Sequence, residues 1–405
     1  MNSLIKLSLT ALLVGLLYFW SSFQDPIAHP KAPIASLSQP KVCLNMIVKD
    51  EKDVIARCLA STLPLIDTWV IVDTGSTDGT QKIIQDFMAK KGIPGKLYER
   101  PWKNFEHNRN EALELAKNEA DHLLFIDADE YFVFTPDYKR PSLEKDFYYI
   151  PLHYGGLKYG RISLIRTDLE WKWAGVLHEA LVIPPSATSE TLEDVYNHIT
   201  QEGARSKDPE KFAKDANVLK EALKKDPHNT RYQFYLAQSY KDGGNHELAL
   251  EHYEKRVAMG GWDQELFYSH LQVAALKEKL GMPSANVVES YVKAIQTRKS
   301  RAEAYYYLAE HQRKQSNHKA AYQLAQIAAT MPESDDVLFV QKWIHDYGAE
   351  LELSINAYWV GKYDECQQIS LKLLKQNDLP PNVRECIQRN LGFANEKLME
   401  MALKQ

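Results

Sequence analysis

Apolar runs and amphipathic segments alternate along the chain between residues 41 and 127. Apolar runs typical of buried strands cover residues 41–48, 68–73 and 122–127, and residues 95–100 give a weaker strand signal. Segments with helical periodicity lie between them at residues 51–63, 80–92 and 108–120, and Gly92 is a typical helix stop. This regular alternation predicts a mostly parallel sheet whose strands are joined by right-handed helical crossovers.

Polar clusters follow three of the predicted strands. They are Lys49–Glu51, Asp73–Asp78 and Asp127–Glu130. The carboxyl ends of parallel strands meet at one edge of a sheet, and open α/β sheets bind their ligands beyond that edge. The pattern therefore predicts a site that is assembled there from three separate segments.

The periodicity changes near residue 205. Residues 235–259 align without gaps on residues 307–331, and the offset is 72 residues, or two units of 36. The pattern resembles tetratricopeptide repeats, in which helix pairs stack into an array with a concave face. We expect residues 205–405 to form such a domain and to hold an acceptor or a protein partner, or to form a homodimer. The plainer alternative is a helical cap that stabilises the preceding domain.

The N-terminal segment differs from the rest of the chain. Residues 7–20 are apolar and uncharged, and no small-residue cleavage site follows them, so we expect residues 1–22 to be an uncleaved signal-anchor. Residues 23–40 contain four prolines and predict an extended tether. Lysines on both sides of the apolar run favour neither orientation. The expectation is a membrane-associated protein with a single N-terminal anchor and no assigned side.

Composition and charge are those of a globular protein. Of the 405 residues, 44% are hydrophobic and 25% are charged, and the net charge is -5. Because there is no basic excess, nucleic acid is not an expected partner, and any anionic ligand must be bound by local cations. The four cysteines lack the spacing of a zinc site, and we expect Cys43 and Cys58 to be buried thiols.

Asp127 and Asp129 are the strongest candidates for a metal site. In an extended segment, residues two apart face the same side, so the two carboxylates could converge on one divalent cation, Mn or Mg. A D-x-D sequence is common in loops, and the alternative is a solvated acidic turn. The preceding apolar run, "HLLF", favours the site because it places the pair at the end of a strand.

Five motifs together resemble one enzyme family. In chain order they are "MIVKDEKDVIARCLAS", "VDTGSTDGT", "HNRNEAL", "LLFIDADEYF" and "WAGVLHEAL". This series resembles the family 2 inverting glycosyltransferases of the GT-A fold, and more narrowly the subgroup in which tetratricopeptide repeats follow the transferase domain. The resemblance implies an α/β GT-A domain for nucleotide-diphospho-sugars at residues 41–204, followed by the helical repeats.

The resemblance also implies roles for particular residues. Val48, Lys49, Asp50 and Glu51 would line the nucleotide pocket, and Asp73 and Thr74 would lie beside the base. Arg109 would approach the phosphates, Asp127 would face the ribose or the metal, and Asp129 would ligate a Mn or Mg ion that bridges the diphosphate. Many relatives carry asparagine in place of Asp50, and a second aspartate, which often contacts uracil, in place of Thr74. A UDP-sugar is the favoured donor.

The last motif supplies a candidate base. Inverting transfer needs a group that takes the acceptor's proton opposite the leaving group, and we assign Glu179. His178 is a candidate third metal ligand or phosphate contact, and Trp171 or Trp173 a candidate stacking partner for the sugar or acceptor. The alternative is that His178 and Glu179 begin a short helix and have no chemical role.

The sequence therefore predicts a metal-assisted, inverting glycosyltransferase of the hexosyltransferase type. It would move a sugar from a nucleotide-diphospho-sugar to a glycan, peptide or protein. The alternative from another class is a tetratricopeptide adaptor with a catalytically inactive GT-A domain. A nucleotidyltransferase-like reaction has little support, because no glycine-rich basic loop follows the first strand.

Overall fold

The computed structural model describes residues 39–154, 157–336 and 338–403, and residues 40–405 form one compact unit. The expected signal-anchor at 1–22 lies outside the described residues, as does the tether at 23–40 except for its last two positions. In the part of the chain that is described, no helix has the length and apolar character needed to cross a bilayer.

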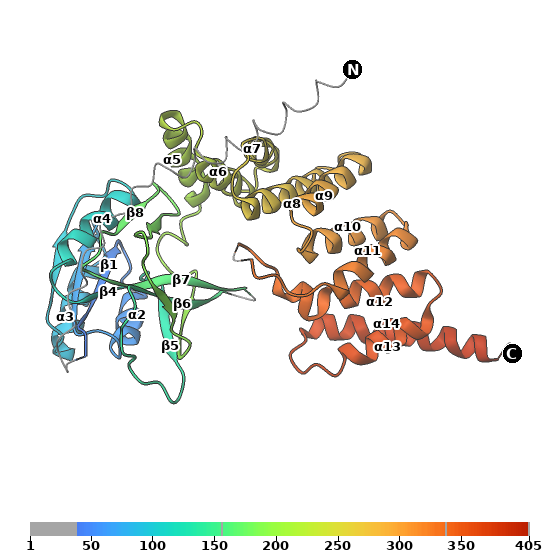
Figure 1. Cartoon of the computed structure of the whole chain (residues 1–405), viewed down its shortest axis with the longest axis horizontal. Helices are drawn as coiled ribbons and strands as arrows, with labels where there is room; N and C mark the ends of the chain where they lie inside the picture. The colour runs from blue at the N-terminus through green and yellow to red at the C-terminus, as the bar shows by residue number, and fades with distance from the viewer. Residues whose placement is uncertain (1–38, 155–156, 337, 404–405) are drawn as a thin grey trace, which may run out of the picture. The chain divides into compact units, whose positions relative to one another are not determined.

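The first half of the unit is built on one mixed sheet (Figure 1). Its strand order is β3-β2-β1-β4-β7-β6-β11-β5, with β10 paired to β6. The strands are β1 (Val42–Val48), β2 (Thr68–Asp73), β3 (Gly95–Glu99), β4 (His122–Phe125), β5 (Glu130–Phe134), β6 (Phe147–Tyr154), β7 (Leu157–Arg166), β10 (Ser189–Thr191) and β11 (Val195–Ile199). A separate antiparallel pair consists of β8 (Lys172–Ala174) and β9 (Ala180–Val182).

The first four strands run parallel, as the sequence predicts. The second half of the sheet is mixed, because β7 is antiparallel to both β4 and β6, and β11 is antiparallel to β5. The expectation of a mostly parallel sheet holds for β1 to β4, and β6 also pairs in parallel with β10 and β11, but the sheet as a whole is mixed. Apolar side chains of α2 (Ile55–Thr62) and α3 (Thr80–Lys91) pack on one face, and those of α4 (Phe105–Ala116) on the other.

Local signals explain where these elements begin and end. Gly92 ends α3 in a left-handed conformation with φ 68, and its amide closes the last turn, as predicted. Helix α4 begins three residues before the predicted start, because the side chain of Asn104 accepts a hydrogen bond from the amide of His107 and caps the helix. Cys43 and Cys58 are buried, which confirms them as core thiols.

The second half is a succession of antiparallel helix pairs. The helices are α5 (Lys211–Lys225), α6 (Thr230–Asp242), α7 (His246–Ala258), α8 (Asp263–Lys279), α9 (Ser284–Thr297), α10 (Ala302–Lys314), α11 (His318–Thr330), η1 (Ile344–Gly348), α12 (Ala349–Trp359), α13 (Tyr363–Leu373) and α14 (Pro381–Ala402). Helices α10 and α11 begin 72 residues after α6 and α7 (302 − 230 and 318 − 246). The predicted repeat offset is therefore the spacing of the helix pairs.

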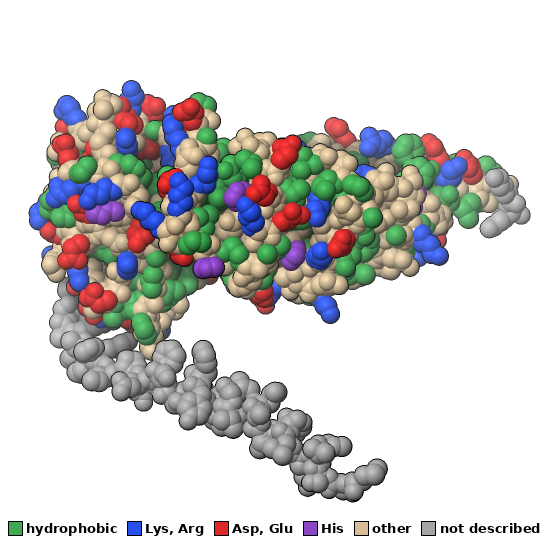
Figure 2. Space-filling view, turned by 90° about the horizontal axis from the view of Figure 1, so that it is seen from above, with side chains coloured by type: hydrophobic (Ala, Val, Ile, Leu, Met, Phe, Trp, Pro, Cys, Tyr) green, Lys and Arg blue, Asp and Glu red, His purple; other side chains and the backbone are tan. Residues whose placement is uncertain are grey.

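Both signs of charge are interspersed over the described surface seen in Figure 2. This distribution agrees with the small net charge of -5. On this face, an anionic ligand has no broad basic surface to bind and depends on local clusters of cations.

Candidate active site

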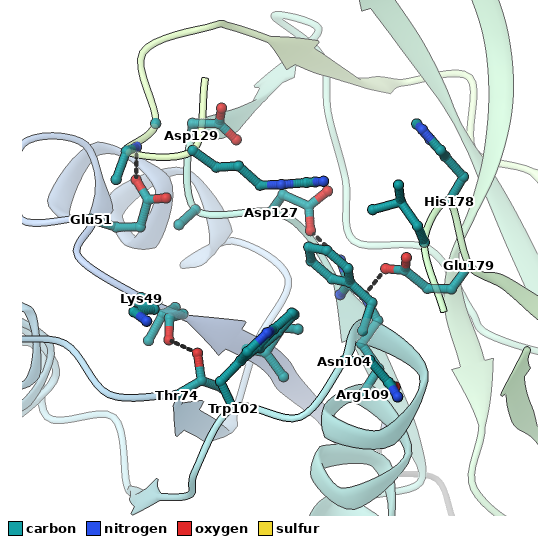
Figure 3. A pocket seen from close by; sticks show the side chains of 18 of the residues that line it. Lys49, Glu51, Thr74, Trp102, Asn104, Arg109, Asp127, Asp129, His178 and Glu179 are labelled. Atoms are coloured by element: carbon teal, nitrogen blue, oxygen red, sulfur yellow. Dashed lines mark hydrogen bonds and ion pairs between the residues drawn. The ribbon is translucent and has the colours of Figure 1, made fainter. Parts of the chain in front are cut away.

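A cavity of about 750 Å³ lies beyond the carboxyl ends of β1, β2 and β4. Its walls come from those strand ends, the start of α4, the segment at 173–179 and the segment at 203–218. Figure 3 shows the central side chains. The sheet edge that the sequence predicts as the binding site is therefore the floor of this cavity.

Ten of the eleven predicted site residues line the cavity. They are Val48, Lys49, Asp50, Glu51, Thr74, Arg109, Asp127, Asp129, His178 and Glu179. Asp73 is the exception: it is buried, and one carboxylate oxygen accepts hydrogen bonds from the amides of Gly75 and Ser76 at 3.0 and 2.8 Å. In the structure Asp73 shapes the loop after β2 and does not face the cavity.

The polar groups after β1 and β2 are locked together. The Thr74 hydroxyl donates to the carbonyl of Val48 at 3.0 Å. Asp50 has a left-handed backbone with φ 56, its amide donates to the Ser76 hydroxyl, and its carboxylate accepts from the amide of Thr77. Asparagine adopts this conformation readily, and aspartate also does so. The departure from the family's asparagine at this position is thus compatible with the turn.

Arg109 joins two carboxylates at the centre of the site (Figure 3). One guanidinium nitrogen donates to Asp127 at 2.6 Å, and another donates to Glu179. Arg161 from β7 contacts the second oxygen of Asp127 at 3.2 Å and also pairs with the buried Glu130. Burial opposes the charge of Asp127, but Arg109 and Arg161 lower its pKa well below the ordinary value. Asp127 is therefore ionised with both oxygens engaged.

Packing fixes the position of Arg109. The guanidinium lies 5.0 Å from the ring of Trp173, in a cation–π arrangement. Because α4 starts at Phe105, Arg109 occupies its second turn. Trp171 does not face the cavity: it packs in the core, and its indole donates to the carbonyl of Arg166. Of the two tryptophans, Trp173 alone lines the cavity.

Asp129 lies on the opposite side of Asp127 from Glu179 (Figure 3). The strand β4 ends at Phe125, and the amide of Glu130 donates to the carbonyl of Asp127, so these residues form a turn. The expectation of an extended D-x-D segment is wrong, because this turn reverses the chain before β5. Burial and the neighbouring charge of Asp127 raise the pKa of Asp129.

Glu51 is a second carboxylate on this side of the cavity. One of its oxygens accepts from the amide of Ala204 at 3.3 Å. Burial raises its pKa to about 7, and the charges of Asp129 and Asp78 add to the effect. Neither Glu51 nor Asp129 has a cationic partner within ion-pair distance among the described residues. Both carboxylates are therefore available to a cation that enters the cavity.

His178 faces the cavity from the segment between β8 and β9, which is no helix. Its backbone is left-handed with φ 53, and its ring stacks on Tyr235 of α6 with the centroids 3.9 Å apart. Desolvation where the ring stacks on Tyr235, together with the charges of Arg205, Arg231 and Lys211, lowers its pKa below the ordinary value and favours the neutral imidazole, although the residue as a whole is exposed. No three His, Cys, Asp or Glu side chains in the described chain gather as a metal site, so Asp127, Asp129 and His178 are not assembled as one.

Part of the cavity wall lies outside the five motifs, although the stretch "PWKNFEHN", Pro101 to Asn108, suggests from sequence a flap over the donor. This part consists of Arg161 on β7, the aromatic residues Trp102 and Phe105, and residues of the segment 203–218, including Arg205 and Lys211. The glycine-containing stretch around Arg161 suggests an acceptor loop from sequence, and the structure places Arg161 against Asp127 instead. The segment 203–218 carries no recognisable motif, and its place in the wall follows from the tertiary fold.

Comparisons with known proteins agree with the predicted transferase domain. Residues 43–141 match the family model for Glycosyl transferase family 2, so the chain carries a domain of that family. The match includes β1 to β4, Arg109, Asp127 and Asp129. Glu179 and His178 lie beyond it.

Three curated proteins are similar to parts of the chain. A TPR repeat-containing protein of Synechococcus elongatus is 36% identical over 24% of this chain and 22% of its own. The SPbeta prophage-derived glycosyltransferase SunS of Bacillus subtilis is 25% identical over 54% of this chain and 53% of its own. The lipopolysaccharide core biosynthesis glycosyltransferase LpsC of Rhizobium meliloti is 33% identical over 25% of this chain and 33% of its own. The chain thus spans between about a fifth and about half of the length of these relatives.

Solved tetratricopeptide repeat proteins also align with the chain. Three of them, one from Parabacteroides merdae, one named YrrB and one from Thermus thermophilus, cover 45–47% of it at 15–18% identity and TM-scores of 0.31–0.36. At these scores the assignment of the helical region rests on its own helix pairs and their 72-residue spacing.

Proposed function

We propose that this protein transfers a sugar from a nucleotide-diphospho-sugar to a glycan, peptide or protein acceptor with inversion at the anomeric carbon. The observation that carries the proposal is the network Asp127–Arg109–Glu179 in a cavity at the carboxyl edge of a family 2 domain. A UDP-sugar is the favoured donor. The Bacillus relative is named a glycosyltransferase and the Rhizobium relative a lipopolysaccharide core glycosyltransferase, which supports the reaction class and a glycan among the acceptors.

The donor side of the site would be the part built on β1, β2 and β4. Val48 to Glu51 and Thr74 form a wall in which the backbone is fixed by hydrogen bonds, as a nucleotide pocket requires. Asp127 is ionised, and its place at the end of β4 suits contact with the ribose. Pre-set polar groups of this kind orient the donor without the cost of ordering loops at each turnover.

Glu179 would be the base that takes the proton from the acceptor hydroxyl. Its carboxylate is held by Arg109 and faces the cavity from the side opposite Asp129 (Figure 3). A base must stand across from the leaving group for in-line displacement with inversion. Arg109 would play a positioning role: it fixes Glu179 and Asp127 at a set separation and offsets their charge.

The residues on the Asp129 side fit a divalent cation. Mg²⁺ in proteins is usually held by one or two carboxylates together with substrate phosphates, and full cages of protein ligands are uncommon. Asp129 and Glu51 are such carboxylates, and they lack a cationic partner among the described residues. Asp129 would hold Mn or Mg, and the ion would supply Lewis-acid stabilisation to the departing diphosphate. His178 remains a candidate ligand only after its ring leaves Tyr235.

Two further features are part of the proposal. The helical region would hold the acceptor or a protein partner, or join two copies of the chain. Residues 1–22 would anchor the protein to a membrane. Both extend beyond the region that the family model covers, which ends at residue 141.

The test is hydrolysis of a panel of nucleotide-diphospho-sugars by the full chain, with and without Mn²⁺. We expect metal-dependent turnover that falls at least about a hundredfold in Asp129→Asn and Glu179→Gln. The matched controls are Asp86→Asn and Glu170→Gln, because both side chains are exposed and lie away from the cavity. Absence of any metal-dependent binding of the panel would refute the proposal and favour the adaptor.

A further inference from the structure

Charged side chains around the cavity fall into two groups. In the first, each charge has a partner: Arg109 and Arg161 pair with carboxylates of the sheet, and Arg205 pairs with Asp215. In the second, the described chain supplies no ion-pair partner. Lys211 belongs to this second group. Among the described residues that line the cavity, it is the cation without an ion pair that the helical region contributes.

The surroundings of Lys211 explain why it is unpaired. It is the first residue of α5, and the two acidic residues just before the helix, Asp208 and Glu210, both engage Lys214, at 2.7 and 3.3 Å. The first turn of α5 contains no acidic side chain, and Glu210 provides no side-chain cap. The ammonium of Lys211 lies 5.3 Å from the ring of Phe212, an apolar neighbour that supplies no counter-charge.

Lys211 lines the cavity beside the sheet-side carboxylates. The segment that leads into α5 is held against them, because the amide of Ala204 donates to Glu51 at 3.3 Å and a Cβ on Gly203 would meet Asp129 at 2.8 Å. Two other lining lysines without ion pairs, Lys49 and Lys103, are exposed, whereas Lys211 is half-buried. A half-buried ammonium without an ion-pair partner at a cavity wall is placed to bind an anion that enters the cavity.

We propose that Lys211 binds the diphosphate of the donor, so that the first helix of the repeat region completes the donor site of the transferase domain. The inference rests on the function proposed above. An ammonium beside phosphate oxygens forms charge-assisted hydrogen bonds, and it offsets the negative charge that the diphosphate gains as the glycosidic bond breaks.

The location favours the donor over an anionic acceptor as the source of this phosphate. The segment before α5 lies against Asp129, since a Cβ on Gly203 would meet its carboxylate at 2.8 Å, and Asp129 is the carboxylate proposed to hold the cation. The sheet side would then supply negative charge for the cation, and the helix side positive charge for the phosphates. A metal–diphosphate group presents both charges, whereas an anionic group on an acceptor would be repelled by Glu179.

The experiment measures binding of UDP, GDP and ADP, and of the corresponding nucleosides, to the full chain in the presence of Mn²⁺. The variants are Lys211→Gln, Lys211→Arg, and Lys220→Gln as a matched control on the exposed side of the same helix. For the diphosphate that binds best, we expect Lys211→Gln to weaken affinity about tenfold or more. Lys211→Arg should retain most of the affinity, and nucleoside affinity should be unchanged in all variants. Lys220→Gln should match the wild type.

The outcomes separate this inference from the proposed function. If the wild type binds a diphosphate and Lys211→Gln binds it equally well, the inference is overturned and the proposed function is not. If Lys211→Gln leaves diphosphate affinity intact but slows transfer to an acceptor, the anion at Lys211 belongs to the acceptor, and the inference is again overturned. If no nucleoside diphosphate binds the wild type, the proposed function itself fails.

Discussion

Replacing Arg109 by glutamine is the perturbation for which the structure gives the clearest expected magnitude. Arg109 is the single cation between Asp127 and Glu179 among the described residues, and its side chain is 12% exposed. Glu179 is 9% exposed and would be left as a buried charge without a partner. Breaking a buried ion pair on one side typically costs about 3–5 kcal/mol. Asp127 adds little to this cost, because it is 39% exposed and retains Arg161.

We therefore expect Arg109→Gln to lower the free energy of unfolding by about 3 kcal/mol, measured by urea denaturation at pH 7.5. The control is Arg57→Gln, whose ion pair with Glu202 is exposed on both sides and should cost at most about 1 kcal/mol. The double variant Arg109→Gln with Glu179→Gln should recover most of the lost stability, because glutamine at 179 needs no counter-charge.

The pH dependence gives an independent check of the same reasoning. Arg109 and Arg161 lower the pKa of Asp127 in the folded state, so the stabilisation is present above the ordinary pKa of an aspartate and is lost as pH falls toward the folded value. The small part of the difference between wild type and Arg109→Gln that Asp127 contributes should thus be lost below about pH 4. Equal stability of Arg109→Gln and Arg57→Gln at pH 7.5 would refute the idea that Arg109 compensates two site carboxylates.

Two further predictions concern Asp129 and the sheet core. Gly203→Ala would place a Cβ 2.8 Å from a carboxylate oxygen of Asp129. Donor hydrolysis should therefore fall about tenfold or more, while the midpoint of unfolding stays close to that of the wild type. Unchanged activity would mean that Asp129 can move without cost. His122 is buried in β4, and its burial, together with the charge of Arg166, lowers its pKa to about 4. As the pH falls, the unfolded chain therefore takes up a proton at this residue before the folded chain does. Wild type should lose about 1.5 kcal/mol more stability than His122→Gln between pH 6.5 and pH 5, and parallel pH profiles in urea denaturation would contradict this.

The sequence was most informative where one rule of local structure applies. Strands β1 to β4 lie within two residues of their predicted positions. Strands β1, β2 and β4 are buried and read as continuous apolar runs, whereas β3 is an edge strand with a weaker signal. Strands β5 to β11 were not predicted. Most are three to five residues long, and β6 and β7 pair with a register shift at Tyr148/Tyr149, so neither length nor alternation marks them.

The candidate site divides in the same way. Residues at the ends of β1, β2 and β4 could be placed from sequence, because topology alone brings those ends to one edge. Asp73 was misplaced because its side chain folds back on its own loop, which depends on φ and ψ angles that the sequence pattern does not determine. Arg161, Gly203 and Lys211 were missed because their roles arise from contacts with residues far away in the chain, and no local spacing records such contacts.

The contacts around Glu179 show why the two halves of the chain act as one site. Leu177 packs in a cluster with Ala216 and Leu219 of α5 and Leu236 of α6. The amide of Val176 donates to the hydroxyl of Tyr232, and Arg231 donates to the carbonyl of His178 at 2.9 Å. The segment that carries the proposed base is therefore positioned from one side by Arg109 of the family 2 domain and from the other by the first helices of the repeat region. Because a base is effective only when it is held within a fraction of an ångström of its working position, those helices belong to the proposed active site.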